Sequence, residues 1–207
     1  MNLRALTPVI ARLAALAAVA ALGACITLFP KTAPSQLYRF DAQVQPPAAG
    51  GPQTTVRIGV LDFDPASAGD TILTVTGDQL AYVQDGRWAI PASELFQEAV
   101  EHGFNAPGGQ IRLVGISDAS RAKLRLRLQV THFETRYLNG PKAAPTVVVT
   151  MRATLNRQDG SLIGELPFDA SAAAGDDTIG AIVQAYDAAV SKAVGDLVSW
   201  VDQNSAA

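Results

Sequence analysis

The stretch RAKLRLRLQVTHFETRY, residues 121–137, carries the strongest structural pattern in the chain. Polar and apolar residues alternate through its first ten positions, and a period of two is typical of a β-strand with one buried face. The residues expected on that buried face are Leu124, Leu126, Leu128 and Val130. Phe133 and Tyr137 then fall on the opposite face, which predicts a bulge near His132.

Similar alternation predicts further strands on both sides of this stretch. Residues 147–156 alternate in the same way and return through an Asp-Gly loop into a strand at 162–170, where Pro167 predicts an edge strand or a bulge. Strands are also expected at 55–63, 71–76 and 111–115. Asp85-Gly86 lies between two apolar runs and predicts a hairpin turn joining 80–84 to 87–90, with Val83 facing Trp88.

Two helices complete the predicted fold. Pro91 opens the first, whose apolar stripe comprises Ala92, Leu95, Phe96, Ala99 and Val100. Thr178 and the acids before it cap the second, which keeps a 3.6-residue period to the C-terminus. We therefore expect an α+β fold in the order β-β-β-α-β-β-β-α, with a mostly antiparallel sheet covered by two helices, the C-terminal one long. The predicted single domain spans residues 54–204.

The N-terminus has the pattern of an exported lipoprotein. Residues 1–24 combine a basic start, a short apolar run and small residues, which is typical of a secretory signal peptide. Residues 22–25 resemble the bacterial lipobox, in which the cysteine, here Cys25, receives diacylglycerol and an acyl chain. Two alternatives stay open: a plain signal peptide cut near Ala24, and an uncleaved membrane anchor, for which the uncharged residues 13–30 are short.

Proline dominates the segment that follows the cysteine. Residues 25–53 carry five of the twelve prolines and read as an extended tether. Leu37, Tyr38 and Phe40 interrupt it and predict a short docking strand at 37–41. The free part, residues 26–35, spans about 30 Å if extended.

Composition excludes several classes of function. A formal net charge of −3 disfavours nucleic-acid binding, and one cysteine with two histidines argues against a zinc site or a disulfide scaffold. No nucleophile elbow, phosphate-binding loop or His-Glu-x-x-His pair occurs in the sequence. We predict no catalytic or metal-binding residue, no enzymatic activity, and no cofactor beyond the lipid on Cys25.

One row of charge is a candidate binding site. Arg121, Lys123, Arg125 and Arg127 share the polar face of the long strand and form a line of about 20 Å. The row would contact an acidic partner or lipid headgroups. The alternative is a structural role, either cross-strand pairing with Glu165 and Asp169 or protection of a sheet edge.

Taken together, the chain resembles the ABC-type transport auxiliary lipoproteins of the PqiC-like family. Besides Cys25 and the tether, short motifs spread over the mature chain carry this resemblance. They are Tyr38-Arg39-Phe40, Leu80-x-Tyr82, Arg87-Trp88-Ala89-x-Pro91, Leu126-x-Leu128-x-Val130-x-x-Phe133-Glu134, Ala153-x-Leu155, and a C-terminal helix ending at Trp200.

The resemblance implies a non-catalytic role beside a permease, an ATPase and a Mce-domain protein that move lipids between two membranes. Ile26 after the cysteine, where Asp would signal inner-membrane retention, favours the periplasmic face of the outer membrane in a Gram-negative cell. A homo-oligomeric ring would match a conduit with rotational symmetry. Two other functions stay open: a tethered regulator of a cell-wall synthase, and a lipid-cleaving enzyme that uses His132 as a base.

Overall fold

The structure is a computed structural model that describes residues 35–44, 54–115 and 121–205. Residues Ser35–Ala207 form one compact unit, and Met1–Pro34 form a separate one. The predicted signal peptide at 1–24, the lipidation site Cys25 and most of the predicted tether lie outside the described residues.

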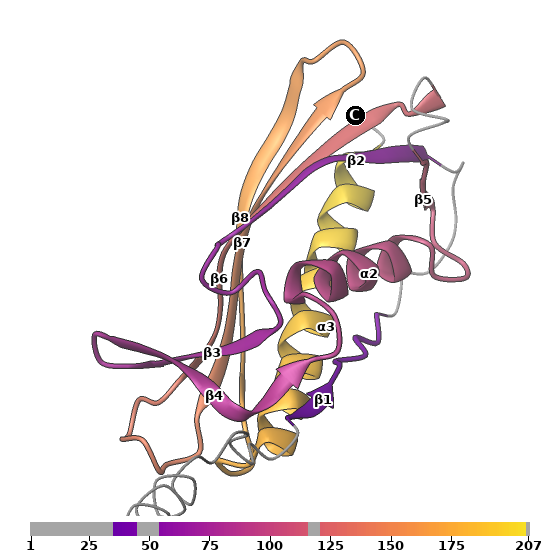
Figure 1. Cartoon of the computed structure of the whole chain (residues 1–207). Helices are drawn as coiled ribbons and strands as arrows, with labels where there is room; N and C mark the ends of the chain where they lie inside the picture. Colours follow the sequence, from indigo (N-terminus) through magenta and orange to yellow (C-terminus); the bar gives the residue numbers. More distant parts are fainter. Residues whose placement is uncertain (1–34, 45–53, 116–120, 206–207) are drawn as a thin grey trace, which may run out of the picture. The chain divides into compact units, whose positions relative to one another are not determined.

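The described residues contain eight strands and two helices (Figure 1). Before the first of these helices come β1 (Gln36–Tyr38), β2 (Thr54–Phe63), β3 (Thr71–Thr76) and β4 (Gln79–Trp88). The remaining elements are α2 (Ala92–Phe104), β5 (Ile111–Leu113), β6 (Leu124–Arg136), β7 (Thr146–Arg157), β8 (Leu162–Ala173) and α3 (Ile179–Asn204).

Strand β6 organises the sheet, because three other strands pair with it. Along one edge β6 pairs antiparallel with β7, which pairs antiparallel with β8. Along its other edge β6 pairs in parallel first with β2 and then, at Thr135 and Arg136, with β3. Strand β4 pairs antiparallel with β3, β1 pairs in parallel with β4, and β5 pairs in parallel with β2.

The α+β class, the two helices and the long C-terminal helix are confirmed, and the sheet is mixed rather than mostly antiparallel. Four of its strand pairings are parallel and three are antiparallel, although the long β6–β7 and β7–β8 ladders are antiparallel as expected. The four strands after α2 correspond to those predicted from residues 111–115, 121–137, 147–156 and 162–170, one more than the predicted order counted. Parallel pairing needs crossover connections, which leave no local turn signal in a sequence.

The predicted hairpin turn at Asp85-Gly86 is wrong. Strand β4 continues through both residues, where its pairing with β3 is irregular, and the turn lies at Gly77 and Asp78, since Thr76 is paired with Gln79. Gly77 has φ +57°, which suits the first central position of a type II′ turn. Gly86 is needed for another reason: a Cβ there would lie 2.9 Å from Cδ1 of Ile179. The predicted Val83–Trp88 pairing is therefore also wrong.

Other local predictions are confirmed. The β6–β7 register shifts between Val130 and His132, and this bulge turns Phe133 into the core. Strand β8, which carries Pro167, pairs only with β7 among the described strands and is an edge. The hydroxyl of Thr178 accepts a hydrogen bond from Ala181 N–H and caps α3. All five residues of the predicted α2 stripe are buried.

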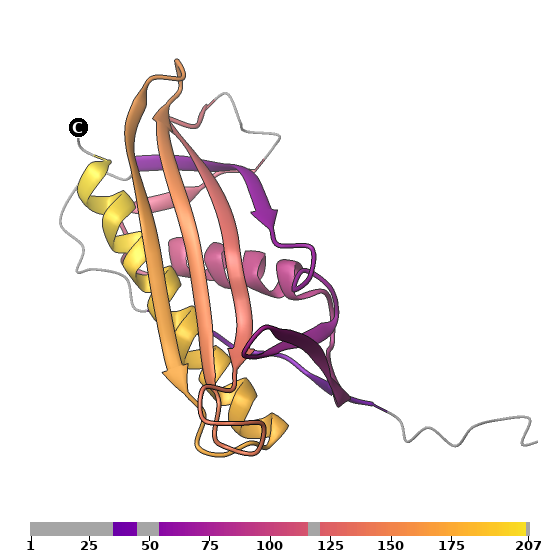
Figure 2. The same ribbon diagram turned by 90° about the vertical axis from the view of Figure 1, so that its left-hand side faces the viewer.

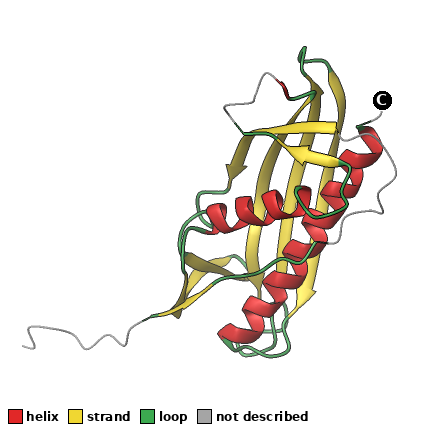
Figure 3. Ribbon diagram, turned by 90° about the vertical axis from the view of Figure 1, so that its right-hand side faces the viewer, coloured by secondary structure: helices red, strands yellow, loops and turns green. Residues whose placement is uncertain are grey.

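Both helices lie on the same face of the sheet, and the core lies between them and the strands (Figures 1 and 3). Aromatic rings fill its centre: Phe40 lies 5.4 Å from Trp88 and 6.4 Å from Tyr186, and Phe133 lies 4.8 Å from Tyr186, as ring-centroid distances. No helix covers the opposite face in the described part of the chain, and Figure 2 looks onto it. We call this the open face.

Candidate docking surface on the open face

The alternation of β6 places the predicted basic row on the open face. Every second residue from Leu124 to Val130 is buried under the helices, so the residues between them point to solvent. All four members of the row, Arg121, Lys123, Arg125 and Arg127, are exposed. Two hydrogen bonds fix the backbone of the row to β2. The carbonyl of Thr55 accepts from Lys123 N–H, and the hydroxyl of Thr55 donates to the carbonyl of Arg121.

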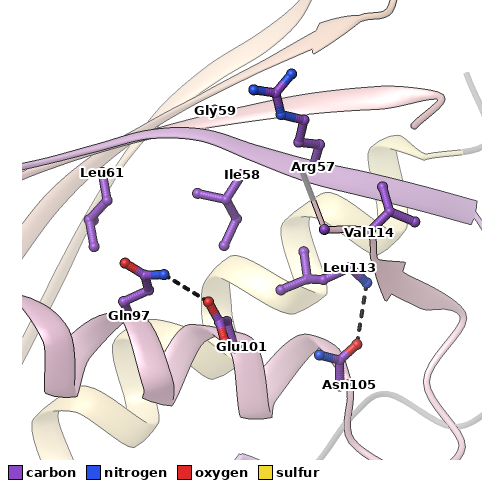
Figure 4. Close-up of a pocket in the computed structure, with 10 residues that line it drawn as sticks. Arg57, Ile58, Gly59, Leu61, Gln97, Glu101, Asn105, Leu113 and Val114 are labelled. Carbon is purple, nitrogen blue, oxygen red and sulfur yellow. Dashed lines mark hydrogen bonds between the residues drawn. The ribbon is translucent and has the colours of Figure 1, made fainter. Parts of the chain in front are cut away.

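The structure adds a fifth cation, Arg57. Strand β2 lies beside β6 with Arg57 in register with Arg125, and register partners share one face of a sheet. Figure 4 shows the guanidinium of Arg57 pointing away from Ile58 and Leu61, which face α2. We call the row together with Arg57 the cationic face.

Sequence reasoning missed Arg57 because it could not place β2 beside β6. The alternation of Val56 and Ile58 about Arg57 already indicated that its side chain lies on the polar face of a strand. Nothing local specified the parallel neighbour of that strand.

The two acids that cross-strand pairing would require, Glu165 and Asp169, contact other residues. Glu165 accepts from Arg152 at 2.7 Å, and Asp169 accepts from the hydroxyl of Thr150 at 2.9 Å. Among the described residues, Lys123, Arg125 and Arg127 take part in no ion pair. Edge protection does not apply either, since β6 has neighbours on both sides.

Uncharged groups surround these cations on the sheet. On β7, Asn156 is in register with Arg125 and Thr154 with Arg127. On β2, Val60 is in register with Arg127. The positions directly opposite Arg125 and Arg127 therefore supply no negative charge, and Arg125 has a second arginine beside it. One acid on this face, Asp62, lies two residues beyond Val60 on β2 and accepts from the amide of Gln129.

The cationic face lies at the end of β6 far from β1, the strand that follows Ser35 (Figure 1). Ser35 leads into β1, which reaches β6 only through β4 and β3, at Thr135 and Arg136. Arg125 precedes Thr135 by ten residues, a separation of about 33 Å along a strand.

A cleft of about 440 Å³ lies on the other side of β2, between this strand and α2 (Figure 4). Its walls combine apolar side chains, including Ile58, Leu61 and Leu113, with polar residues from β2 and α2. Arg57 also borders the cleft, and its Nε is buried without a hydrogen-bond partner among the described residues. The amide of Gln97 donates to Glu101 at 2.8 Å, and Leu113 N–H donates to the side-chain oxygen of Asn105. The cleft holds no serine, cysteine or histidine.

The described residues do not assemble His132 into a catalytic group. His132 is exposed at the bulge, and its ring nitrogen lies 3.5 Å from the hydroxyl of Thr131. Its register partner is Thr150, whose hydroxyl donates to Asp169. Within the described ranges, no group of three or more His, Cys, Asp or Glu side chains could hold a metal ion.

The pKa shifts in the described residues occur in α3, at its start and in two loops. In the loops, burial raises the pKa of Tyr137, and hydrogen bonds from Ser161 lower the pKa of Asp159. Burial raises the pKa of Tyr186, whose hydroxyl accepts from Thr135. Burial also raises the pKa of Asp187, although the hydrogen bond from Asp41 N–H opposes the shift. Hydrogen bonds from Thr178 lower the pKa of Asp176 just before α3. Each of these pKa shifts arises from burial or a local hydrogen bond, and none marks a reactive centre in the described residues.

The mixed sheet with helices on one face occurs in solved structures of other proteins. A Xanthomonas campestris protein matches with a TM-score of 0.71 and 20% identity, covering 82% of this chain and 96% of that one. An uncharacterized protein matches with a TM-score of 0.59 and 16% identity, covering 82% and 97%. A hypothetical protein of Chlamydia trachomatis matches with a TM-score of 0.52 and 10% identity, covering 73% and 97%. At these identities the likeness shows a shared fold.

The chain belongs to the family of ABC-type transport auxiliary lipoprotein components, whose model matches residues 72–198. This match confirms the family expected from the sequence motifs. It includes the basic row and begins after Arg57 and Cys25. No curated protein matches the chain. Among the helices that the structure describes, none has the length and hydropathy needed to span a bilayer.

Proposed function

We propose that this chain is a lipid-anchored, non-catalytic docking component of an ABC-type, Mce-associated lipid transport system, held at the periplasmic face of the outer membrane. The observation that carries the proposal is the family match over residues 72–198, which joins the domain to an ABC-type transport system. The lipobox-like sequence ending at Cys25 supplies the anchor, and Ile26 after it favours export to the outer membrane.

A positioning role fits the chemistry of the surface. The cationic face offers a charged surface, and in the cleft between β2 and α2 Gln97 donates to Glu101 while Asn105 accepts from Leu113 N–H. An acyl anchor confines the domain to a membrane surface, and each buried methylene adds about 0.8 kcal/mol to that binding. A weak docking contact then acts at a high effective concentration.

The proposal includes the partners of such a system. A permease and an ATPase would drive transport, and a Mce-domain protein would form the periplasmic conduit on which this chain docks. A homo-oligomeric ring would present the same docking surface to each subunit of a conduit with rotational symmetry.

Affinity isolation of the full-length lipoprotein from detergent-solubilised membranes of its own cells tests this function. We expect to recover a Mce-domain subunit together with the permease or ATPase, and to find diacylglycerol and acyl chains on Cys25 by intact-protein mass spectrometry. The matched control is Cys25→Ala, which should leave the outer-membrane fraction. Recovery of a cell-wall synthase in place of transport subunits, or an unmodified Cys25 thiol, would overturn the proposal.

A further inference from the structure

We propose that the cationic face docks onto an acidic protein surface, and not onto the lipid headgroups of the membrane that anchors the chain. This inference rests on the proposed function and names the chemistry of the partner. The cations that carry it are Arg57 on β2, Arg125 and Arg127 on β6, and Lys123 just before β6.

The first argument is the cost of placing these charges together. Arg57 and Arg125 are register partners, and like charges directly opposite each other destabilise a sheet. If these positions served only the fold, Thr or Asn, the residues that occupy the neighbouring positions of β7, could replace the cations. Like charges kept side by side, with no ion pair to Arg125 or Arg127 in the described residues, indicate that the opposite charge comes from outside the domain.

The second argument is the shape of the array. Lys123 and Arg127 are four strand residues apart, about 13 Å, and Arg57 widens the array by one strand spacing, about 4.8 Å. A single small anion would contact only one or two of these side chains. Carboxylates on alternate residues of a strand repeat at about 6.6 Å, and those four apart on a helix at about 6 Å, so either would match the row.

The third argument is where the array lies and what surrounds it. The cationic face is about 33 Å along β6 from the strands that lead back to Ser35, the residue next to the predicted tether. Its exposed apolar neighbours are aliphatic: Val60 beside Arg127, and Leu162 beside Asn156. Val60 and Leu162 lie apart on β2 and β8, whereas a membrane-surface segment presents a continuous apolar face to lipid, and arginine is enriched at protein interfaces.

Site-specific photocrosslinking in cells tests the inference with the full-length lipoprotein. A benzophenone amino acid replaces Val60, which is 46% exposed and adjacent to Arg127. A second probe replaces Leu138 beyond the opposite end of β6 as a control for position. We expect the probe at 60, and not the probe at 138, to link to a protein segment rich in Asp and Glu, identified by mass spectrometry of the linked peptide.

Charge variants decide whether the cationic face makes this contact. R125E/R127E should lower the crosslinking yield by about tenfold or more, because it replaces attraction with repulsion. R125Q/R127Q, which perturbs the sheet less, should lower the yield by a smaller factor. The matched control is K142E/K192E, with the same change of charge at exposed residues in the loop after β6 and on α3, and its yield should equal wild type. Changing the linked acids to Lys should restore the yield with R125E/R127E.

Two results would overturn the inference. One is a probe at 60 that links mainly to phospholipid, which would assign the face to a membrane. The other is an unchanged yield with R125E/R127E. Either result leaves the proposed function standing if transport subunits are still recovered in the affinity isolation, so the two failures can be told apart.

Discussion

Replacing Phe40 with Ala should strongly destabilise the domain, although Phe40 belongs to a segment that the sequence places in a tether. Its side chain is only 3% exposed and contacts the rings of Trp88, Phe133 and Tyr186. Losing a buried phenyl group costs about 2–3 kcal/mol of transfer free energy, and each lost ring pair adds about 0.5–1.5 kcal/mol. Because neighbouring rings relax into part of the cavity, we expect a total of about 3–5 kcal/mol.

Chemical denaturation followed by tryptophan fluorescence measures this loss, since Trp88 lies 5.4 Å from Phe40 and reports directly on the site. The matched control is Leu37→Ala in the same segment, where the side chain is 68% exposed and the expected change is within about 0.5 kcal/mol. Equal stabilities for the two variants would refute the reasoning, because they would show that residues 36–42 are not part of the folded core.

Three further predictions test other contacts. The Thr135–Tyr186 hydrogen bond is long at 3.3 Å, so T135V and Y186F should each lower the free energy of unfolding by about 1 kcal/mol. The double variant should lose less than the sum of the two, and additive losses in urea unfolding would show that the bond contributes nothing. Because burial raises the pKa of Asp187, the folded state binds this proton more tightly than the unfolded state. Stability should therefore fall as pH rises from the ordinary aspartate pKa through the raised one, and D187N should flatten that slope in pH-dependent melts while keeping an acceptor for Asp41 N–H. Gly77→Ala should lower the stability by about 1 kcal/mol, because Gly77 has φ +57° and alanine is strained there. A melting temperature equal to that of the wild type would contradict the assignment of the turn to Gly77.

Local periodicity was sufficient to predict the elements with strong patterns. The alternation around Leu126 and the stripe through Phe96 each correctly identified an element and its buried face. The bulge near His132 was also predictable, because a change of parity within one strand needs no knowledge of its neighbours. These features depend on residues that are close in sequence.

The errors arose where distant segments decide the structure. Asp85-Gly86 has the sequence of a turn, but the small size of Gly86 serves the close approach of Ile179, far along the chain. The candidate site was incomplete for the same reason: the row on β6 was visible in the sequence, whereas Arg57 joined it only through parallel pairing between β2 and β6. Long-range register therefore decides which charges share a surface.

The route from Ser35 into the sheet has a mechanical consequence. A pull on the chain before Ser35 reaches the domain through β1, which meets β4 over three residues, and then through Phe40, whose ring is wedged among aromatic neighbours. In a molecule gripped at the cationic face and drawn from Ser35, tension would run the length of β6, whose long ladders resist shear. Short junctions lie at the Ser35 end of that series, three residue pairs between β1 and β4 and two between β3 and β6. Strain between two moving assemblies would therefore separate these strands first and spare the surface proposed to recognise the partner.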